Sequence, residues 1–316
     1  MYNKTIVFID GREGTTGLRI YDRLEAMDDI ELIVLKDEER KNTEIRRQAL
    51  NTCDIAFLCL PDSAAIDAAE LVENDKVILI DTSTAHRTDY MWAYGMPELS
   101  NKHRDKIANS KKIAVPGCHA SGFIVLVYPL IENKIIPDNT RLTCFSLTGY
   151  SGGGKKMISD YEAVNRDSMY NAPRQYALTQ SHKHLKEMSA VTGLKVNPVF
   201  CPIVGDYYSG MEVTVPIFKE DMYSGYAAED IKDIYREKYS GKIITYIEND
   251  DENGFFSANI LSGYDNMTVS VKGNEDRILL TARYDNLGKG ASGAAVECMN
   301  IKLGKEITDG LNIKEC

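Results

Sequence analysis

The first third of the chain alternates short apolar runs with longer stretches of helical character. The runs are rich in β-branched residues and comprise Thr5–Asp10, Glu31–Leu35, Asp54–Leu60, Val77–Asp81 and Ile113–Val115. Short β-branched runs separated by helical segments are typical of βαβ units and a parallel sheet. The pattern therefore predicts a doubly wound α/β domain at the N-terminus.

The pattern changes after Pro116, where apolar positions alternate with polar ones. Glu212–Ile217 and Met267–Val271 show this alternation most clearly. It predicts an antiparallel sheet with one packed face and one polar face. Pro216 lacks an N–H group to donate, so we expect it at an edge or a bulge.

Three helices are predicted in this second part. Ser121–Asn133 carries a strongly apolar run, Asp230–Tyr239 is amphipathic, and Ala291–Asn300 has small residues along one side. Gly241 is a plausible stop for the second of them. We find no repeat or low-complexity linker, so the boundary near Gly117 is expected to be a change of sheet type.

The composition excludes several classes of function. The 316 residues are 43% hydrophobic and 27% charged, which suits roughly two ordinary globular domains. A net charge of −10 argues against a nucleic-acid partner, because a phosphate backbone would repel such a surface. There is no apolar stretch of the ~18 residues that a bilayer span needs and no signal peptide, so we expect no membrane contact and a cytoplasmic location.

A glycine-rich loop follows the first predicted strand and opens the first predicted helix. It contains Gly11, Arg12, Gly14, Thr15, Thr16 and Gly17. Glycines here allow a tight turn and let backbone N–H groups approach a pyrophosphate. The spacing G-x-x-G-x-x-G differs from the commonest dinucleotide fingerprint, but the position after an N-terminal strand favours nucleotide binding over an ordinary turn.

The residues after the second strand bear on the choice between NAD and NADP. An acidic residue there binds a ribose hydroxyl, whereas a basic one binds a 2′-phosphate. Both signs follow Leu35, with Lys36, Asp37 and Arg40, and Arg12 is a further basic candidate in the glycine loop. The residue chemistry alone leaves the cofactor open.

Cys118 is the predicted nucleophile among seven cysteines. It lies in the segment 116–122, between a short strand and an apolar helix. A helix N-terminus stabilises a thiolate, and its N–H groups suit an oxyanion on an attacked carbonyl. Small residues on both sides favour an accessible thiol over a buried structural one. The cysteines form no C-x-x-C pair, so neither a disulfide framework nor a zinc knuckle is expected.

His182 and His184 are candidates for acid–base chemistry. In an extended segment the two would share a face, whereas in a helix they would diverge; exposed histidines near a helix cap are the plain alternative. No third ligand at suitable spacing accompanies them, so we expect no metal. Two further segments, 149–156 and 285–293, combine glycines with lysines and suit phosphate contacts or plain turns.

Taken together, five motifs resemble the N-acetyl-gamma-glutamyl-phosphate reductases of arginine biosynthesis in their shorter, type 2 form. The motifs occupy residues 11–17, 81–87, 94–99, 116–122 and 285–295, in order over nearly the whole chain. The resemblance implies an α/β fold, with an N-terminal Rossmann domain and an inserted α+β catalytic domain of the semialdehyde dehydrogenase type. It implies residues 1–117 with a C-terminal helix in 288–316 for NADP, and residues 118–287 for catalysis and oligomerisation.

The resemblance also implies a reaction and its residues. An acyl-phosphate substrate, N-acetyl-L-glutamyl 5-phosphate, would be reduced with NADPH through a thioester on Cys118, by a homodimer or homotetramer. His182 or His184 would be the acid–base. The implied cofactor contacts are Gly11, Arg12, Gly14, Thr15, Thr16, Gly17, Lys36, Arg40, Ser83, Asn286, Gly288 and Gly290. The implied substrate contacts are Arg87, Ser151, Gly152, Gly153, Lys155 and Glu187.

The chain departs from the family pattern at two places. Leu185-Lys186 stands where many relatives have Thr-Pro, and Glu297 stands where a Gln is usual. The first departure leaves open which histidine is the acid–base. A reductase of aspartyl phosphate or of a protected aminoadipyl phosphate, and a protein that senses NADP without turnover, are the alternatives.

Overall fold

The computed structural model describes residues 4–315, which divide into two compact units. The N-terminal unit contains the described residues up to Pro116 together with Ala291–Leu311. The other unit, called the catalytic unit here after the predicted nucleophile Cys118, contains Gly117–Gly290 with the described residues from Asn312 onward. The division expected from the sequence, 1–117 with 288–316 for the cofactor and 118–287 for catalysis, assigns functions as well as bounds and stays a prediction.

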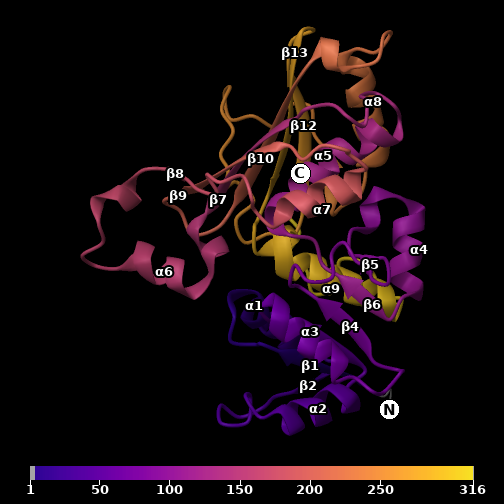
Figure 1. The fold of residues 1–316 in the computed structure, drawn as a ribbon, viewed down its shortest axis with the longest axis vertical. Coiled ribbons are helices and arrows are strands. Elements are labelled where there is room, and N and C mark those ends of the chain that lie inside the picture. Colours follow the sequence, from indigo (N-terminus) through magenta and orange to yellow (C-terminus); the bar gives the residue numbers. More distant parts are fainter. Residues whose placement is uncertain (1–3, 316) are drawn as a thin grey trace. The chain divides into compact units, whose positions relative to one another are not determined.

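A parallel sheet with strand order β2-β1-β3-β4-β6-β5 forms the centre of the N-terminal unit (Figure 1). The order reverses beside β1, which lies between β2 and β3. In open α/β sheets, ligands bind beyond the carboxyl ends of the strands at such a point. The elements are β1 Thr5–Asp10, α1 Thr15–Glu25, β2 Ile30–Ile33, α2 Thr43–Thr52, β3 Ile55–Leu58, α3 Asp62–Glu70, β4 Ile78–Asp81, β5 Ala93–Tyr94, α4 Asn101–Asn109, β6 Lys112–Ala114 and α9 Gly293–Leu303.

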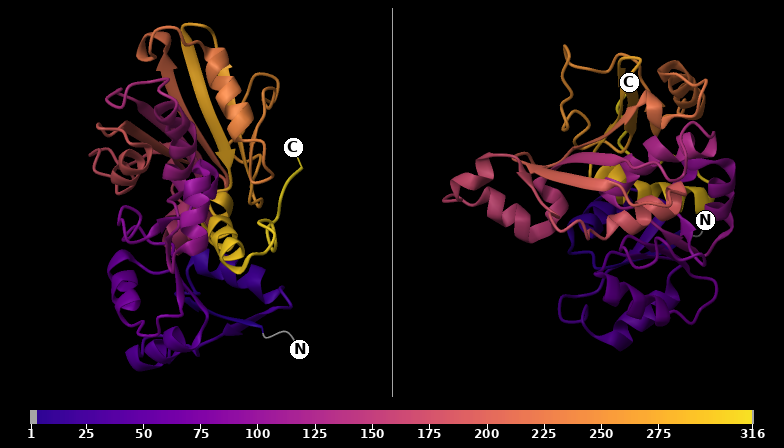
Figure 2. Two further views of the ribbon diagram at one scale, coloured as in Figure 1. Left: turned by 90° about the vertical axis from the view of Figure 1, so that its right-hand side faces the viewer. Right: turned by 45° about the horizontal axis from the view of Figure 1, so that its top comes forward.

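The central strands of this sheet are buried on both faces. Val7 and Ile9 of β1 pack in a cluster with α1, α4 and α9, whereas Phe8 between them packs with α2 and α3. Burial on both faces explains why these strands have continuous apolar sequences. The C-terminal helix α9 returns to this unit and packs against α1, α4 and β4 (Figure 2).

The catalytic unit contains a mixed sheet with strand order β11-β12-β13-β10-β7-β9-β8. The prediction that this sheet is antiparallel was wrong for two pairs of strands, because β7 runs parallel to β9 and β11 runs parallel to β12. Alternating polarity therefore does not fix strand direction. It did not fix one-sided burial in β12 either, because Met267–Val271 is buried throughout. The elements are α5 Cys118–Glu132, β7 Thr143–Gly149, α6 Gly154–Glu162, β8 Arg174–Gln175, α7 His184–Thr192, β9 Val199–Gly205, β10 Met211–Phe218, α8 Ala228–Lys238, β11 Ile244–Tyr246, β12 Met267–Gly273 and β13 Arg277–Tyr284.

Pro216 lies where β10 has a strand on one side only among the described residues. The pairing of β10 with β7 covers Met211–Thr214, while its pairing with β13 continues through Pro216 and Leu279. The missing N–H group therefore leaves no gap between β10 and β7. The predicted edge position of Pro216 is confirmed.

Helix α5 packs directly on the sheet of the catalytic unit, against β10 and β13. It begins at Cys118 and not at Ser121 as the apolar run predicted. A Cβ atom added to Gly122 would lie 2.6 Å from Val213 Cγ2 and 2.7 Å from the Tyr284 hydroxyl. The Tyr284 hydroxyl accepts the Gly122 N–H at 3.0 Å and donates to the Cys118 carbonyl at 2.6 Å. The glycine thus lets α5 approach closely enough for both bonds.

We predict that Gly122→Ala destabilises the chain by ~1–3 kcal/mol, because the added methyl group overpacks this contact. Urea unfolding followed by far-ultraviolet circular dichroism measures the change. Gly241→Ala is the control, since a Cβ atom at that position would meet Ile244 O at 3.9 Å, an ordinary contact distance. Equal midpoints for the two variants would show that α5 has room to shift.

Candidate active site

Cys118 is the first residue of α5, and no side chain caps the start of this helix. Its side chain is half-buried. The buried carboxylate of Glu187, on α7, accepts the N–H of Gly117 at 2.8 Å. This bond holds the residue before Cys118, while the helix N-terminus provides the positive end of a dipole at the thiol.

The end of β13 and the turn after it form another side of the Cys118 environment. A Cβ atom added to Gly290 would lie 3.1 Å from Cys118 Cβ, so the turn contacts the cysteine directly. Burial raises the pKa of Tyr284 well above its usual value, and the nearby Cys118 raises it further. Tyr284 therefore remains a protonated donor to the Cys118 carbonyl.

A buried histidine follows the cysteine immediately. His119 Nδ1 lies 2.6 Å from Ser146 Oγ, and His119 Nε2 lies 2.6 Å from the Tyr176 hydroxyl. Burial lowers the pKa of His119 to about 3, and His182 lowers it further. The imidazole is therefore neutral, with one nitrogen donating and the other accepting.

The three histidine rings form one cluster with Phe200. The ring centroid of His119 is 6.1 Å from that of His182 and 5.7 Å from that of His184, and the last two lie 4.7 Å apart. Helix α7 begins at His184, and Lys183 before it already has αR backbone angles, while the His182 carbonyl accepts the Leu185 N–H at 3.0 Å. Both rings nevertheless lie in one cluster, so the expectation that only an extended segment would bring the two histidines together was wrong.

His182 has a defined hydrogen-bonding role at its Nδ1 atom. The main-chain N–H of His184 donates to His182 Nδ1 at 3.3 Å, which leaves the Nε2 atom to carry the proton in the neutral ring. Burial lowers the pKa of His182, and Lys183 lowers it further. A neutral imidazole near a nucleophile suits proton transfer at neutral pH.

His119, Tyr176 and Tyr284 are site residues that the sequence interpretation missed. His119 was treated as part of a turn of small residues, although its place beside Cys118 was a usable signal. Tyr176 follows β8 in a segment that has no helical or strand period. Tyr284 was an ordinary aromatic at the end of a strand, and only the packing of α5 brings its hydroxyl to the cysteine.

A second group of predicted residues lies around Ser151. Asn286 donates from Nδ2 to Ser151 Oγ at 3.0 Å and accepts the Gly210 N–H at 2.9 Å. A Cβ atom added to Gly152 would lie 3.4 Å from Asn286 Nδ2. The structure thus brings Ser151, Gly152 and Asn286 together. Gly153 ends this turn, and Lys155 is exposed on the first turn of α6.

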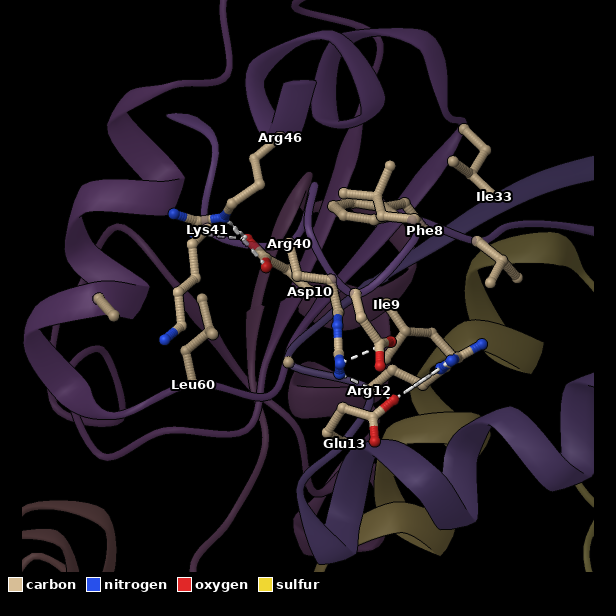
Figure 3. Close-up of a pocket in the computed structure, with 15 residues that line it drawn as sticks. Phe8, Ile9, Asp10, Arg12, Glu13, Ile33, Arg40, Lys41, Arg46 and Leu60 are labelled. Carbon is tan, nitrogen blue, oxygen red and sulfur yellow. Dashed lines mark hydrogen bonds and ion pairs between the residues drawn. The ribbon is translucent and has the colours of Figure 1, made fainter. Parts of the chain in front are cut away.

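The N-terminal unit holds a pocket of about 490 Å³ at the carboxyl ends of β1 and β2, with Leu60 after β3 (Figure 3). Arg12 and Arg40 line it as predicted for a cofactor site, whereas Lys36 is exposed and its main-chain N–H donates to Glu39. The other lining residues are Phe8, Ile9, Asp10, Gly11, Glu13, Ile33, Val34, Leu35, Asp37, Lys41, Arg46, Leu60 and Ala64.

The glycine loop beside this pocket has no room for side chains at two positions. Gly11 has φ +86°, and an added Cβ atom would lie 2.3 Å from the Cys59 carbonyl oxygen. A Cβ atom at Gly17 would lie 2.5 Å from the Gly11 carbonyl oxygen. The start of α1, at Thr15 and Thr16, has Gly14 as its N-cap and no side-chain cap. Its N–H groups suit a phosphate.

Asp10 and Arg46 form a buried ion pair at the base of the pocket, which the sequence interpretation also missed. Arg46 donates to both carboxylate oxygens of Asp10, at 2.7–3.2 Å. The pair joins α2 to the end of β1. Elsewhere in the unit, Asp81 accepts from the main-chain N–H and hydroxyl of Ser83 and lies 2.7 Å from His86 Nδ1.

Arg87 is buried, and its guanidinium is held by main-chain carbonyls of its own unit. The Nε atom donates to Val115 O at 2.8 Å, and one terminal nitrogen donates to Thr82 O at 2.9 Å.

In residues 4–315 no group of three acidic, histidine or cysteine side chains is arranged to hold a metal ion. No helix in the described part of the chain has the length and apolarity needed to span a bilayer.

Comparisons with known proteins place both units. The family model of the semialdehyde dehydrogenase dimerisation domain matches residues 118–286, and that of the semialdehyde dehydrogenase NAD binding domain matches residues 6–109. Among solved structures, aspartate semialdehyde dehydrogenase II from Vibrio cholerae has a TM-score of 0.72 at 18% identity and covers 96% of this chain and 99% of its own. The predicted fold class is confirmed.

A second solved structure is aspartate semialdehyde dehydrogenase with NADP from Candida albicans. It has a TM-score of 0.65 at 15% identity, over 96% of this chain and 100% of its own. The N-acetyl-gamma-glutamyl-phosphate reductase 2 of Nostoc sp. is 41% identical over 314 residues, which is 96% of this chain and 98% of that protein. The resemblance seen in the sequence motifs is confirmed, and the chain belongs to the family of N-acetyl-gamma-glutamyl-phosphate reductases.

Proposed function

We propose that this chain reduces N-acetyl-L-glutamyl 5-phosphate with NADPH, in arginine biosynthesis, through a covalent thioester on Cys118. One observation carries the proposal. Cys118 begins an uncapped helix whose preceding residue is held by Glu187, and the rings of His182 and His184 gather around the histidine that follows it. A thiol at a helix N-terminus beside imidazoles suits acyl transfer.

The covalent chemistry conserves atoms and electrons. The Cys118 thiolate attacks the acyl-phosphate carbonyl, a carbon–sulfur bond forms, and inorganic phosphate leaves with the electrons of the carbon–oxygen bond. NADPH, when bound, supplies the hydride that reduces the thioester carbon. The resulting thiohemiacetal expels the Cys118 thiolate as its oxygen forms the aldehyde carbonyl, and N-acetyl-L-glutamate 5-semialdehyde is released.

One of the two histidines moves the proton of the thiohemiacetal oxygen. His182 and His184 remain equal candidates, because their rings share one site. The α5 N–H groups suit the oxyanion that forms on the attacked carbonyl. Tyr284 and Glu187 position this helix end through their bonds to Cys118 O and Gly117 N.

The substrate's charges would be met by two groups of residues. Arg87 is our candidate for the α-carboxylate, because main-chain carbonyls already fix its guanidinium, which pairs with carboxylates through parallel hydrogen bonds. Ser151, Gly152, Gly153 and Lys155 are the candidates for the phosphate. A site built for an acetyl amide rejects a free ammonium group, which would be desolvated there without a partner.

NADP fits the pocket of the N-terminal unit. Arg12, Arg40 and Lys41 surround it with positive charge, which suits a ribose 2′-phosphate, while Gly11 and the uncapped start of α1 suit the pyrophosphate. The Candida albicans relative was solved with NADP. The remaining proposed contacts are Gly14, Thr15, Thr16, Gly17, Lys36, Ser83, Asn286, Gly288 and Gly290.

The catalytic unit carries a dimerisation domain, and we propose that the sheet face opposite α5 pairs two copies into a homodimer, alone or within a homotetramer. Phe145, Val199 and Leu279 share this face by their register, because Phe145 is level with Thr214 and Leu279 with Pro216. All three are exposed. Exposed apolar side chains that gather on one face of a sheet typically mark an interface.

We also propose a cytoplasmic location. The described cysteines are all free thiols, which is usual in a reducing compartment.

The first prediction concerns Cys118→Ser. The variant loses phosphate-dependent reduction of NADP by N-acetyl-L-glutamate 5-semialdehyde, because a serine hydroxyl is not ionised at neutral pH, but it keeps its NADP affinity. Cys201→Ser, a half-buried cysteine of β9, is the control and should keep activity. Turnover by Cys118→Ser at the wild-type rate would exclude the thioester. Preference for unacetylated glutamate semialdehyde or aspartate semialdehyde would exclude the substrate.

The second prediction separates His182 from His184. Replacement of the acid–base residue by Asn lowers kcat by ~10²-fold or more. If His182 is that residue, the wild-type acid limb lies below its ordinary pKa of about 6.5, because burial lowers the pKa of His182. Activity is then retained above this limb and lost as the pH falls through it. The variant that removes the limb identifies the base, and unchanged profiles in both variants would leave the pair with a structural role.

The third prediction tests the sheet face. Phe145→Lys places a charge among the apolar side chains of the proposed interface, so sedimentation equilibrium should give half the wild-type mass. Leu178→Lys is the control, since Leu178 is exposed in the segment between β8 and α7, outside this face. An unchanged mass for Phe145→Lys would place the interface elsewhere.

A further inference from the structure

One carboxylate oxygen in the cofactor pocket is shared by two arginines. Glu13 Oε1 lies 3.2 Å from a terminal nitrogen of Arg12, 3.3 Å from Arg12 Nε and 3.0 Å from a terminal nitrogen of Arg40 (Figure 3). Arg12 belongs to the glycine loop after β1, and Arg40 belongs to the turn after β2. Two separate segments thus direct their positive charges to one point, and Glu13 places an anionic oxygen at that point.

The convergence marks a place where an anion is strongly favoured. Two guanidinium groups that lie within hydrogen-bonding distance of the same oxygen repel one another unless a negative charge lies between them. Arg40 is further oriented by Asp37, which accepts from its other terminal nitrogen at 2.7 Å. The two guanidinium groups are therefore oriented to bind one anionic oxygen between them.

Glu13 is a replaceable occupant of this place. Its side chain is 48% exposed, so its carboxylate can turn into water at small cost, since exposed ion pairs contribute only ~0–1 kcal/mol. A phosphate monoester carries about −1.5 to −2 charges and three acceptor oxygens. It therefore satisfies two guanidinium groups better than a single carboxylate does.

We propose that Glu13 is an internal competitor of the ribose 2′-phosphate, which holds Arg12 and Arg40 together in the absence of cofactor and lowers the affinity for NADP(H) but not for NAD(H). The inference rests on the NADP preference proposed above. Because the competitor is tethered, it is present at every cofactor exchange. It moderates the affinity of both the oxidised and the reduced cofactor through the group that they share, and so favours release of the product NADP.

Glu13→Gln is the decisive variant, because it keeps the shape of the side chain and removes the charge. Isothermal titration calorimetry with NADP, NAD, 2′-AMP and 5′-AMP measures binding without turnover. We expect Glu13→Gln to bind NADP and 2′-AMP at least about fivefold more tightly than the wild type, and NAD and 5′-AMP within about twofold. The gain should shrink as salt is raised from about 0.05 to 0.3 M, since salt screens exposed charges.

Glu38→Gln is the matched control. It removes one carboxylate from the exposed turn after β2, at a residue that is not part of the pocket lining, and should leave all four affinities within about twofold of wild type. If the wild type prefers NADP but Glu13→Gln binds NADP no more tightly, the competitor role of Glu13 is overturned while the cofactor proposal stands. Weaker NADP binding by Glu13→Gln would show that Glu13 instead holds the two arginines in place for the cofactor. Equal wild-type affinities for NADP and NAD would overturn the cofactor proposal and this inference with it.

Discussion

The close packing of α5 on its sheet is the contact on which the catalytic unit depends. Gly122 allows the helix to come near enough for the Tyr284 hydroxyl to bond both the Gly122 N–H and the Cys118 carbonyl. Glu187 completes this arrangement from α7 by accepting the Gly117 N–H. The main chain on both sides of the cysteine is therefore tied to other elements, and the position of its sulfur follows from packing at a distance from the reacting atoms.

Two side chains near Cys118 form hydrogen bonds without carrying a charge. His119 stays neutral because burial lowers its pKa to about 3, and Tyr176 stays protonated because burial raises its pKa. These groups provide donors and acceptors without competing cations. In the proposed mechanism, a thiolate on Cys118 would be stabilised by the helix dipole, which packing fixes in advance and which requires no reorganisation. The Glu187 carboxylate accepts the Gly117 N–H and so holds the main chain before Cys118.

The sequence predicted those features that local pattern or composition specifies. Continuous apolar runs predicted the parallel sheet, because strands that are buried on both faces have apolar residues at successive positions. The bounds of β1 were predicted correctly. Alternation gave β10 and β12 of the second sheet but not the strand directions, since β11 runs parallel to β12. Cys118 was predicted as the nucleophile from local features, the preceding Gly117 and the start of a helix, and that role stays a prediction. Tyr176 and Tyr284 were missed because only tertiary packing brings them to that helix.

The pocket proposed for the cofactor illustrates how a chain with a net charge of −10 keeps a cationic site. Each pocket arginine has a carboxylate nearby: Asp10 binds Arg46 in a buried pair, whereas Asp37 and Glu13 bind Arg40 at the surface. The buried pair is costly to break, because either partner alone would be a desolvated charge. It therefore fixes α2 to β1 and is unavailable to a ligand. The exposed ion pairs exchange partners readily, so their arginines are the ones that could bind a phosphate. Burial, more than the number of positive charges, thus decides which arginines stabilise the fold and which are available to the proposed cofactor.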